Sequence, residues 1–574
     1  MTRIASLLFA LLLCPVGAGA LAAPEPAVPL PPDGPTGRPT AGPATPVALD
    51  VAIATRLIDE SRRIAGRPVD LPTVRRFYAR RGFAPLWLDA AGAPTPAARR
   101  ALEVLAAADA EGLSAADYHA DALADRLRAD GTAARVDVEL LLSDAVMRYG
   151  AHLRAGRVPP RTIAPDLAVT PPAVDRFAVA EGTAAAADAG AHLAALAPTR
   201  PDYAGLKEAL RRYRALEAKG GWPAVPAPSV TKLEPGMRDP AVKALRRRLA
   251  ATGEFGEKGK DKAAAASDLY DTVLKKAVER FQARHGLFVD GVVGSATLAA
   301  LNVTAAERVG QILANLERVR WLPDGYGDRH VLVNVPDYTL KAVDHGETVL
   351  DMRVIVGTKV RRTPILSSTI TSVVFNPTWT MPVRLAREDY LPKLLKDPGY
   401  LASHGFTVYS SWSADARPLD SRRIDWKSVG RGIGSMRLRQ DPGPNNALGQ
   451  MKFNIPNALD VYLHDTPSRE KFDKTVRTFS SGCVRVGDPM ALAGFVMQGM
   501  EDWPGERRQQ VLDKGDTKTV VLKQPVAVHI LYQTAWMDAD GVVQFREDIY
   551  GRDVELLDAV ARKAPPAQRV ALGD

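Results

Sequence analysis

A cysteine and an upstream histidine are the residues of this sequence whose types and spacing could do chemistry. Cys483 lies in the run "SSGCVR" at 480–485, and His464 precedes it by 19 residues, in "YLHDT" at 462–466. A thiolate can attack an acyl carbon, and a nearby imidazole can accept the proton of the thiol. The separation is long enough for the histidine to lie on a neighbouring strand and face the sulfur. The pair predicts acyl transfer, with Cys483 as nucleophile and His464 as general base.

The residues beside the cysteine could serve the same reaction. Gly482 lets the backbone approach a ligand closely, so its amide and that of Cys483 could hold an oxyanion, with the Ser481 amide as a further candidate. Arg485 lies on the same face of an extended chain as the sulfur, where it could bind a substrate carboxylate or form a structural ion pair. Ser480 and Ser481 could instead serve only to shape the turn.

His464 needs a partner for its second ring nitrogen, to fix the tautomer. Asp465 is adjacent, but successive side chains of a strand point to opposite faces, so its carboxylate need not do this and a backbone carbonyl would serve. A zinc site of His464, Cys483 and His404 lacks a fourth ligand at suitable spacing, so we expect no metal and no cofactor. The flanking glycine, serines and arginine argue against Cys483 as an inert core cysteine.

The first residues predict export. Residues 1–23 have the layout of a secretory signal peptide: Arg3, an apolar run over 4–13 and then small residues. The large Leu13 argues against lipid attachment at Cys14. Removal of the segment would leave an exported protein with one of its two cysteines and no disulfide partner in its own chain. A lone thiol in an oxidising compartment is a hazard unless its reactivity is used.

Length and charge place further bounds on the protein. Its 574 residues are too many for one core, so three or four domains are expected. Residues 24–47 are dense in Pro, Gly and Ala and predict a disordered linker. The net charge of +9 is compatible with an anionic polymer or peripheral association with a membrane or wall surface. No basic block is interleaved with aromatic residues, so we expect no nucleic-acid partner.

The first half of the chain predicts helices. Apolar residues three and four positions apart, such as Leu102 and Leu105, indicate a helical domain over 48–225. Residues 231–302 then predict a compact module of three short helices, in which the polar stretch 257–267 is expected to be a surface insertion. A further helix over 303–328 is expected to continue the helical scaffold.

The periodicity changes at His330, where Val331, Val333 and Val335 alternate with other residues as in a strand. We therefore predict a mainly-β domain over 329–535, with a charged and peripheral C-terminal tail over 536–574. Residues 388–440 are interpreted as an inserted segment. Further strands are predicted at 349–356, 370–375, 451–455, 458–463, 519–522 and 526–532, and a helix at 489–500.

The histidine followed by Gly-Cys-x-Arg resembles the L,D-transpeptidase catalytic family, also called the YkuD-like domain. That family carries a histidine, a gap of somewhat under twenty residues, and then Ser/Thr-His-Gly-Cys-x-Arg or Asn. The sequence departs from it at Ser481, where many members have histidine. The larger periplasmic members resemble it better, in "YLHDTP", "SSGCVRV", "NPTWTMP" and "NALGQMKFNIPN".

The resemblance extends over most of the chain after the linker. "GMRDPAVKALRRRLAATG" and "FQARHGLFVDGVVGSATLAALN" are similar to a peptidoglycan-binding domain of three helices. "FYARRGFAPLW", "EGLSAADYH" and "LLLSDAVMRYGAHLRAGRVPP" are similar to the scaffold of the larger members. The resemblance implies a multidomain α+β protein: an α-helical scaffold domain, a peptidoglycan-binding module and a β-sandwich-like catalytic domain in which 388–440 forms a lid.

The resemblance also implies a reaction. Cys483 would take an acyl group from a tetrapeptide stem of peptidoglycan, at the bond between meso-diaminopimelate and D-alanine. A second stem would resolve the thioester into a 3→3 cross-link without ATP. Tyr462 and Trp379 are candidates for lining the donor site, or for strand and core packing. Carbapenems are expected to acylate Cys483, and other cell-wall synthesis enzymes are candidate partners.

Other functions remain open at this point. Water could resolve the thioester, which would make an L,D-carboxypeptidase or endopeptidase. Another amine could do so, with attachment of a lipoprotein or exchange of D-amino acids as the result. A non-catalytic wall-binding scaffold is a third hypothesis, against which the intact set of His464, Gly482, Cys483 and Arg485 argues. In papain-like proteases the cysteine precedes the histidine, which is the reverse of the order here.

Overall fold

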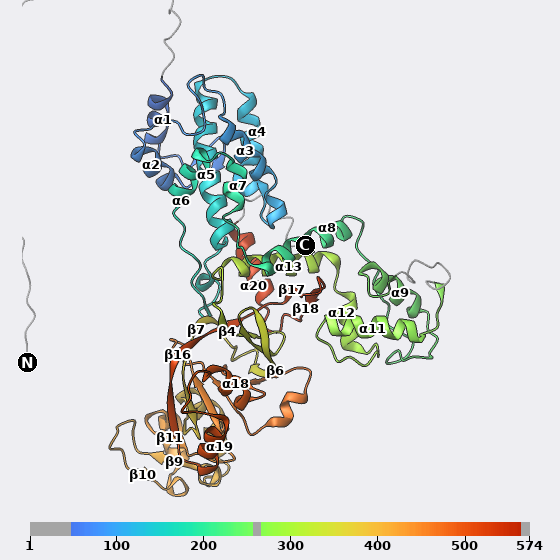
Figure 1. Cartoon of the computed structure of the whole chain (residues 1–574), viewed down its shortest axis with the longest axis vertical. Helices are drawn as coiled ribbons and strands as arrows, with labels where there is room; N and C mark the ends of the chain where they lie inside the picture. Colours follow the sequence, from blue (N-terminus) through green and yellow to red (C-terminus); the bar gives the residue numbers. More distant parts are fainter. Residues whose placement is uncertain (1–47, 257–265, 564–574) are drawn as a thin grey trace, which may run out of the picture. The chain divides into compact units, whose positions relative to one another are not determined.

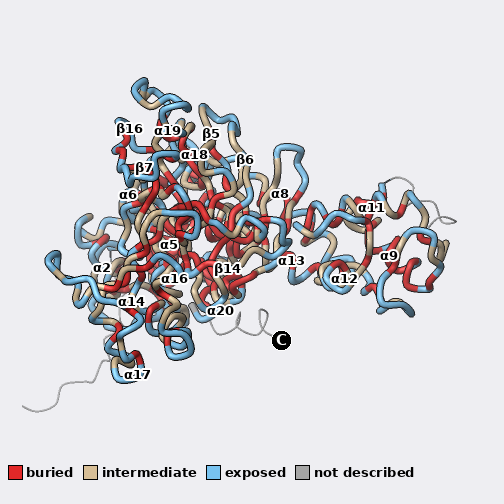
Figure 2. Tube along the Cα trace, turned by 90° about the horizontal axis from the view of Figure 1, so that it is seen from below, coloured by how far each residue is buried: buried red, intermediate tan, exposed pale blue. Residues whose placement is uncertain are grey.

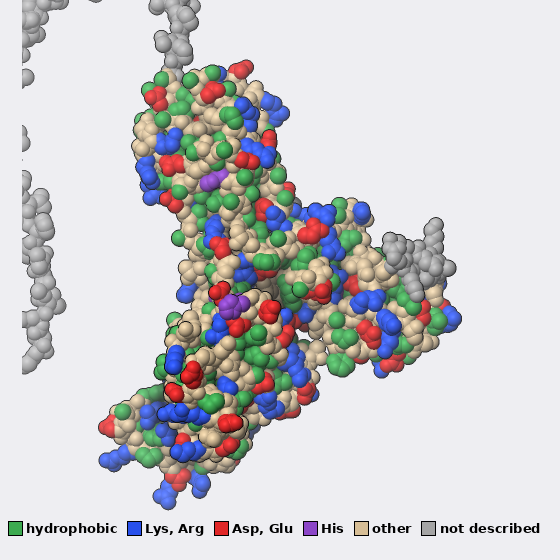
Figure 3. Space-filling model, in the orientation of Figure 1, with side chains coloured by type: hydrophobic (Ala, Val, Ile, Leu, Met, Phe, Trp, Pro, Cys, Tyr) green, Lys and Arg blue, Asp and Glu red, His purple; other side chains and the backbone are tan. Residues whose placement is uncertain are grey.

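The computed structural model describes residues 48–256 and 266–563. The predicted signal peptide and linker, and residues 257–265 of the predicted surface insertion, lie outside the described residues. Among the helices that are described, none is long and apolar enough to cross a bilayer. On the face drawn in Figure 3, basic and acidic side chains are interspersed, so the net charge of +9 does not gather into one patch there.

The N-terminal helical domain is built around α5 (Thr132–Ala155), a helix buried on most sides (Figures 1 and 2). Its run Leu140, Leu141 and Leu142 is fully buried because neighbouring helices cover it all round. Residues 63–68 form a small hairpin of β1 (Arg63–Ile64) and β2 (Arg67–Pro68). The surrounding helices are α1 (Leu49–Ile58), α2 (Leu71–Arg80), α3 (Pro96–Ala106), α4 (Ala120–Arg128), α6 (Arg176–Ala185), α7 (Ala189–Ala194) and α8 (Pro201–Glu217).

The next unit is a three-helix module, as predicted, of α9 (Ala241–Ala251), α11 (Thr272–Arg284) and α12 (Ser295–Asn302). Leu245, Leu274 and Phe281 are fully buried in its own core. Arg284 ties the module to the rest of the chain, because its Nε donates to the Val543 carbonyl at 2.5 Å and its guanidinium also bonds the Tyr213 hydroxyl.

Helix α13 (Ala305–Arg320) follows and connects the helical and β-rich parts. A capping box starts it: the Thr304 hydroxyl accepts from the Glu307 N–H at 3.2 Å, and the Glu307 carboxylate accepts from the Thr304 N–H at 2.7 Å. Its buried Arg318 pairs with Asp553 of the C-terminal helix at 2.5 Å.

The β-rich domain is a single mixed sheet. Its strands run in the order β12-β13-β15-β6-β5-β4-β16-β7-β3, and β12 also pairs with β7, so the sheet closes on itself. The β-rich prediction is therefore confirmed, but the sandwich-like arrangement is replaced by a closed ring of strands. The strands are β3 (Leu167–Ala168), β4 (Arg329–Asn334), β5 (Thr339–Asp344), β6 (Glu347–Gly357), β7 (Ile365–Phe375), β12 (Met451–Asn454), β13 (Leu463–His464), β14 (Thr478–Ser480, beside β6), β15 (Val484–Val486) and β16 (Lys518–Leu531).

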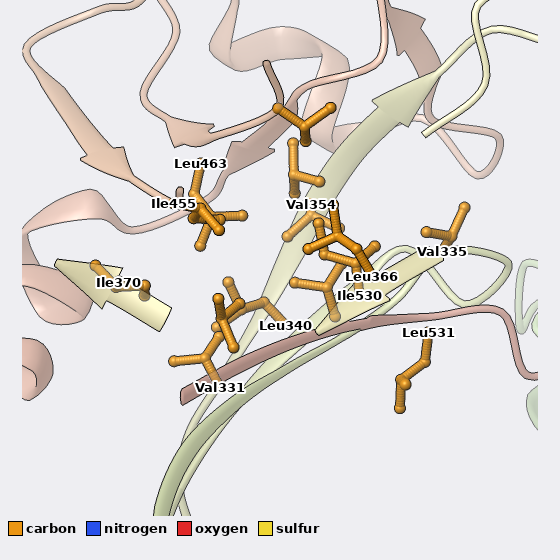
Figure 4. Close-up of a cluster of buried hydrophobic side chains, with 14 of the residues drawn as sticks. Val331, Val335, Leu340, Val354, Leu366, Ile370, Ile455, Leu463, Ile530 and Leu531 are labelled. Carbon is orange, nitrogen blue, oxygen red and sulfur yellow. The ribbon is translucent and has the colours of Figure 1, made fainter. Parts of the chain in front are cut away.

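The inside of this ring is the main hydrophobic core. Val331, Leu340, Val354, Leu463 and Ile530 come from five different strands and gather there (Figure 4). Helices α18 (Pro489–Val496) and α19 (Gly505–Lys514) pack against the same core. The two-residue alternation of the sequence arises because one face of each strand points into this core and the other points away.

Two strand predictions differ from the structure. Only Leu463–His464 of the predicted strand 458–463 is a strand, because the Asn457 side chain accepts from the N–H groups of Leu459 and Val461 and forms a turn. The predicted strands 519–522 and 526–532 are one strand, β16, with a register shift between Val521 and Val526.

The inserted segment is larger than predicted. A separate sheet of order β10-β9-β11-β8 and a separate core extend it to residues 379–448, which we call the insert. Trp379 and Leu448 belong to that core, so the insert is folded rather than a loose loop. Its elements are β8 (Trp379–Thr380), α14 (Val383–Leu385), α15 (Leu391–Leu394), α16 (Tyr400–Ser403), β9 (Phe406–Tyr409), β10 (Pro418–Leu419), α17 (Trp426–Val429) and β11 (Arg437–Gln440).

The prediction of a peripheral C-terminal tail is wrong for residues 536–563. Strands β17 (Ala535–Met537) and β18 (Val543–Phe545) pack on the core of the helical domain, and α20 (Arg552–Lys563) packs on the core of the β-rich domain. The prediction was based on the many charged residues of this segment, but several of them pair with partners that are distant in sequence. Buried Arg552, for example, pairs with Asp166 at 2.8 Å.

Candidate active site

Four of the predicted site residues share the outer face of the closed sheet. Strands β13 and β15 run parallel, with Leu463 opposite Val484, and both of these side chains are fully buried in the core. Side chains alternate along a strand, so the residues on either side of this pair point outward. Those outward residues are Tyr462, His464, Cys483 and Arg485, with His464 directly opposite Arg485.

The loop before the cysteine is fixed by one serine. The Ser480 hydroxyl donates to the Cys483 carbonyl at 2.5 Å and accepts from the Gly482 N–H at 3.2 Å. Gly482 has φ +123°, a conformation that other residues adopt only with strain. Its amide is therefore occupied, whereas no acceptor is described for the N–H groups of Ser481 and Cys483. Ser480 shapes the turn, and these two amides are the better oxyanion candidates.

The imidazole of His464 is buried and held by the main chain. Its Nδ1 lies 2.5 Å from the Asp465 carbonyl oxygen, so this nitrogen carries the proton and Nε2 is left as the acceptor. The Asp465 carboxylate is used elsewhere: it accepts from the Gln450 N–H at 2.9 Å and pairs with Arg469 at 3.1 Å. Burial, and then the charge of Arg485, lower the pKa of His464 to about 3.

The thiol of Cys483 is half-buried and faces polar groups. Its sulfur lies 3.9 Å from the Asp460 carbonyl oxygen. Burial raises the pKa of the Cys483 thiol, while Tyr462, Lys452 and Arg485 act in the opposite direction. The pKa of the thiol is raised and that of the imidazole is lowered, so the resting site holds a neutral thiol and a neutral imidazole.

Two cations flank the sulfur. Lys452 of β12 lies opposite His464 in the sheet, and its Nζ is 4.2 Å from the centre of the Tyr462 ring. The Nε of Arg485 is buried without a hydrogen-bond partner. Within the described parts of the chain, neither cation is ion-paired with a carboxylate. Burial lowers the pKa of both groups, which is the expected effect of desolvating an unpaired cation.

The insert closes one side of this face. Tyr462 packs against the insert core, which contains Trp379. Trp379 itself is 8% exposed and packs on Phe406 and Tyr390, with ring centres 5.9 and 6.3 Å away. Tyr462 therefore lies between the insert and the sulfur, whereas Trp379 is mainly a core residue of the insert.

One arginine joins the insert to the cysteine loop. Arg361 donates to the Ser481 hydroxyl at 3.2 Å and pairs with Glu388 and Asp389 of the insert at 2.9 and 2.5 Å. Both carboxylates lie in a π-helical turn, Ala386–Tyr390. This local geometry is often found near functional sites.

Among the described residues, no three His, Cys, Asp or Glu side chains converge as metal ligands. His404 lies at the end of α16, stacked on Tyr400 with ring centres 4.0 Å apart.

Three regions of the chain match known protein families. Residues 72–210 match the scaffold domain, residues 238–301 a peptidoglycan binding domain, and residues 328–521 the L,D-transpeptidase catalytic domain. The last match spans the strands that carry His464 and Cys483. The chain contains an L,D-transpeptidase catalytic domain. The multidomain α+β organisation predicted from the sequence is confirmed by these matches together with the fold.

Individual relatives agree with this assignment. A curated protein of Haemophilus influenzae named "Putative L,D-transpeptidase" is 37% identical over 246 residues, which cover 43% of this chain. The match spans about half of that relative, 48% of its length.

Solved structures of L,D-transpeptidases also align with the chain. One from Xylanimonas cellulosilytica is 16% identical, with a TM-score of 0.18, and covers 53% of this chain and all of its own. One from Stackebrandtia nassauensis is 14% identical, with a TM-score of 0.20, and covers 53% of this chain and 97% of its own.

Sequence reasoning missed Lys452, Asp460, Arg361 and Tyr390. Lys452 had a weak signal, since it is a lysine between the apolar Met451 and Phe453 of a predicted strand. Its place opposite His464 depends on the pairing of β12 with β13, which the sequence does not show.

Proposed function

We propose that the chain is a peptidoglycan L,D-transpeptidase that forms 3→3 cross-links through a thioester on Cys483. One observation carries the proposal: the register of β13 and β15 points His464 and Cys483 outward on adjacent strands of a matched L,D-transpeptidase catalytic domain. The Cys483 thiol and the His464 imidazole are both neutral before the reaction. His464 must therefore accept the thiol proton while the sulfur attacks the substrate.

In the first step, the Cys483 sulfur attacks the carbonyl carbon at the L-centre of meso-diaminopimelate in a tetrapeptide stem. The thiol proton passes to Nε2 of His464, and the amides of Cys483 and Ser481 stabilise the oxyanion. The C–N bond to D-alanine then breaks. His464 returns its proton to the leaving amine, and a thioester remains on the enzyme.

In the second step, the side-chain amine of diaminopimelate in a second stem attacks the thioester. His464 accepts a proton from this amine and passes it to the departing sulfur. A new amide bond forms as the C–S bond breaks, so the free thiol is regenerated and no ATP or cofactor is consumed. The reaction exchanges one amide for another, as required in a compartment without ATP.

The remaining parts of the site have roles in binding. Arg485 is suited to a donor carboxylate, because its guanidinium is partly buried and has no carboxylate of its own. Tyr462 and the insert would form one wall of the donor site. The peptidoglycan binding domain would hold the enzyme on its polymeric substrate, and the enzyme would therefore act outside the cytoplasm, in the periplasm.

The test is mass spectrometry of muropeptides after incubation of the full chain with sacculi rich in tetrapeptide stems. The expected products are dimers joined through two diaminopimelate residues, together with free D-alanine. Tripeptides without dimers would show that water resolves the thioester, as in an L,D-carboxypeptidase. Unchanged muropeptides, with no mass adduct on Cys483 after carbapenem treatment, would contradict acyl transfer altogether.

A further inference from the structure

A small polar pocket adjoins the nucleophile on the side away from Arg485. It has a volume of about 300 Å³ and lies between the end of β12 and the turn before β13. The Asp460 carbonyl oxygen at its edge is 3.9 Å from the Cys483 sulfur. Its polar lining residues are Lys452, Asn454, Asn457, Asp460 and Tyr462.

Most polar groups of this pocket are already used. Asn457 bonds four main-chain groups of its own turn, for example by donating to the Ile455 carbonyl at 2.7 Å. The amide of Asn454 donates to the Ser372 hydroxyl at 2.8 Å. These two side chains therefore build the pocket walls and have little capacity left for a ligand.

Two opposite charges in the pocket are not used in this way. The Lys452 ammonium is half-buried over the Tyr462 ring, and no carboxylate pairs with it in the described structure. The exposed carboxylate of Asp460 is near enough to favour the charged form of Lys452, but it forms no ion pair. A cation and an anion that face one pocket without joining each other suit a ligand that carries both charges.

We propose that this pocket binds the zwitterionic amino-carboxylate head of a diamino-acid side chain, with the carboxylate on Lys452 and the ammonium on Asp460. This inference rests on the proposed function for its substrate class. A pocket beside the sulfur could take the head group of the donor, whose acyl carbon is bound to Cys483. It could equally take the head group of the acceptor, whose amine must reach the thioester.

The first experiment measures binding without turnover. The rate of Cys483 alkylation by iodoacetamide is followed in the full chain with and without meso-diaminopimelate. We expect meso-diaminopimelate to slow alkylation several-fold, because it covers the sulfur from the adjoining pocket. Pimelate and 1,5-diaminopentane, each with only one kind of charge, should give little protection at the same concentration.

Substitutions show which residues are responsible for the protection of Cys483. Lys452→Met and Asp460→Asn should lose the protection, expressed as the ratio of the two rates so that changes in thiol reactivity cancel. Lys452→Arg should keep much of it, and Lys427→Met, which removes an exposed lysine of the insert, should behave like the wild type. Equal protection by pimelate, protection that survives in both pocket variants, or no protection in the wild type would each overturn the proposal.

The second experiment separates the two sources of the head group. Stems in which the head carboxylate is converted to an amide are supplied as donor or as acceptor. If the donor head occupies the pocket, amidation of the donor and Lys452→Met should each slow thioester formation. If the acceptor head occupies the pocket, amidation of the acceptor and Lys452→Met should each slow only aminolysis of the thioester. A wild type that shows protection but forms no thioester with any stem would contradict the proposed function and leave the pocket intact.

Discussion

The helical domain and the outer face of the closed sheet each hold a polar cluster that is wholly or partly withdrawn from solvent, and the two are built in opposite ways. In the helical domain, the Glu139 carboxylate accepts from the N–H groups of Leu86, Trp87 and Leu88, and from the Tyr78 hydroxyl at 2.7 Å. On the outer face of the closed sheet, Lys452 and Arg485 have no carboxylate partner within the described residues.

This difference in pairing distinguishes groups that stabilise the fold from groups that are free to bind a ligand. Every acceptor position of Glu139 is filled from within the chain, so the cluster fixes the loop 84–88 against α5. Unpaired buried cations cost free energy, which a bound carboxylate would recover. Removing a member of the first cluster should therefore destabilise the protein, and removing a member of the second should change its chemistry.

The largest expected effect is on the nucleophile. Cys483→Ala should reduce thioester formation and cross-linking by at least about 10³-fold, because no other thiol is described in the site. Its thermal unfolding midpoint should stay close to that of the wild type, because the side chain is small and only half-buried. Turnover would be measured by muropeptide analysis, and unchanged turnover would exclude the cysteine as nucleophile.

The second prediction concerns the buried cluster around Glu139 in the helical domain. Glu139→Ala leaves the buried main-chain N–H groups of Leu86, Trp87 and Leu88 without their acceptor, so it should lower the free energy of unfolding by about 3–5 kcal/mol. Lys452→Met, at a site without an internal carboxylate partner, should change it by less than about 1 kcal/mol. Urea unfolding followed by circular dichroism measures both. Equal losses in the two variants would abolish the distinction between the clusters.

The third prediction concerns pH. The pKa of His464 is about 3 in the folded protein, against about 6.5 for an exposed histidine. The unfolded state therefore binds more protons between these values, so the stabilisation is complete above pH 6.5 and is lost as the pH falls toward 3. The contribution is on the order of 1 kcal/mol per pH unit.

His464→Gln removes this titration. The difference in urea midpoint between the wild type and His464→Gln should therefore change steadily from pH 7 to pH 4, with the wild type losing more stability. Parallel curves for the two proteins would show that the histidine is not buried in its neutral form.

The smallest effect should come from the serine that shapes the cysteine loop. Ser480→Ala removes the hydrogen bonds to the Cys483 carbonyl and from the Gly482 amide, which should cost about 1–2 kcal/mol of stability. Acylation by a carbapenem, followed by intact mass, should slow by less than tenfold because the nucleophile itself remains. Ser481→Ala, which removes a hydroxyl that accepts from Arg361, provides the matched control.

The sequence predicted the order of the matched domains and the residues that gather at the candidate site, because these depend on local patterns. The alternation around Val331 and the spacing of His464 and Cys483 can be read directly. Pairing between distant segments cannot, and this is why the closed sheet, the placement of Lys452 and the packing of α20 were missed. Asn457 shows the same limit at short range, since its side-chain hydrogen bonds turned a predicted strand into a loop.

Strand β3 has a consequence for how this protein can be divided. It comes from the helical half of the chain, yet Leu167 and Ala168 extend the sheet beside β7. At the other end, the family match stops at residue 521, inside β16, and the C-terminal helix α20 lies beyond it. A fragment cut at the limits of sequence similarity would lose an edge strand and most of a central one. The β-rich domain is consequently discontinuous in the gene, and its barrel can be completed only after residue 531 has emerged from the ribosome.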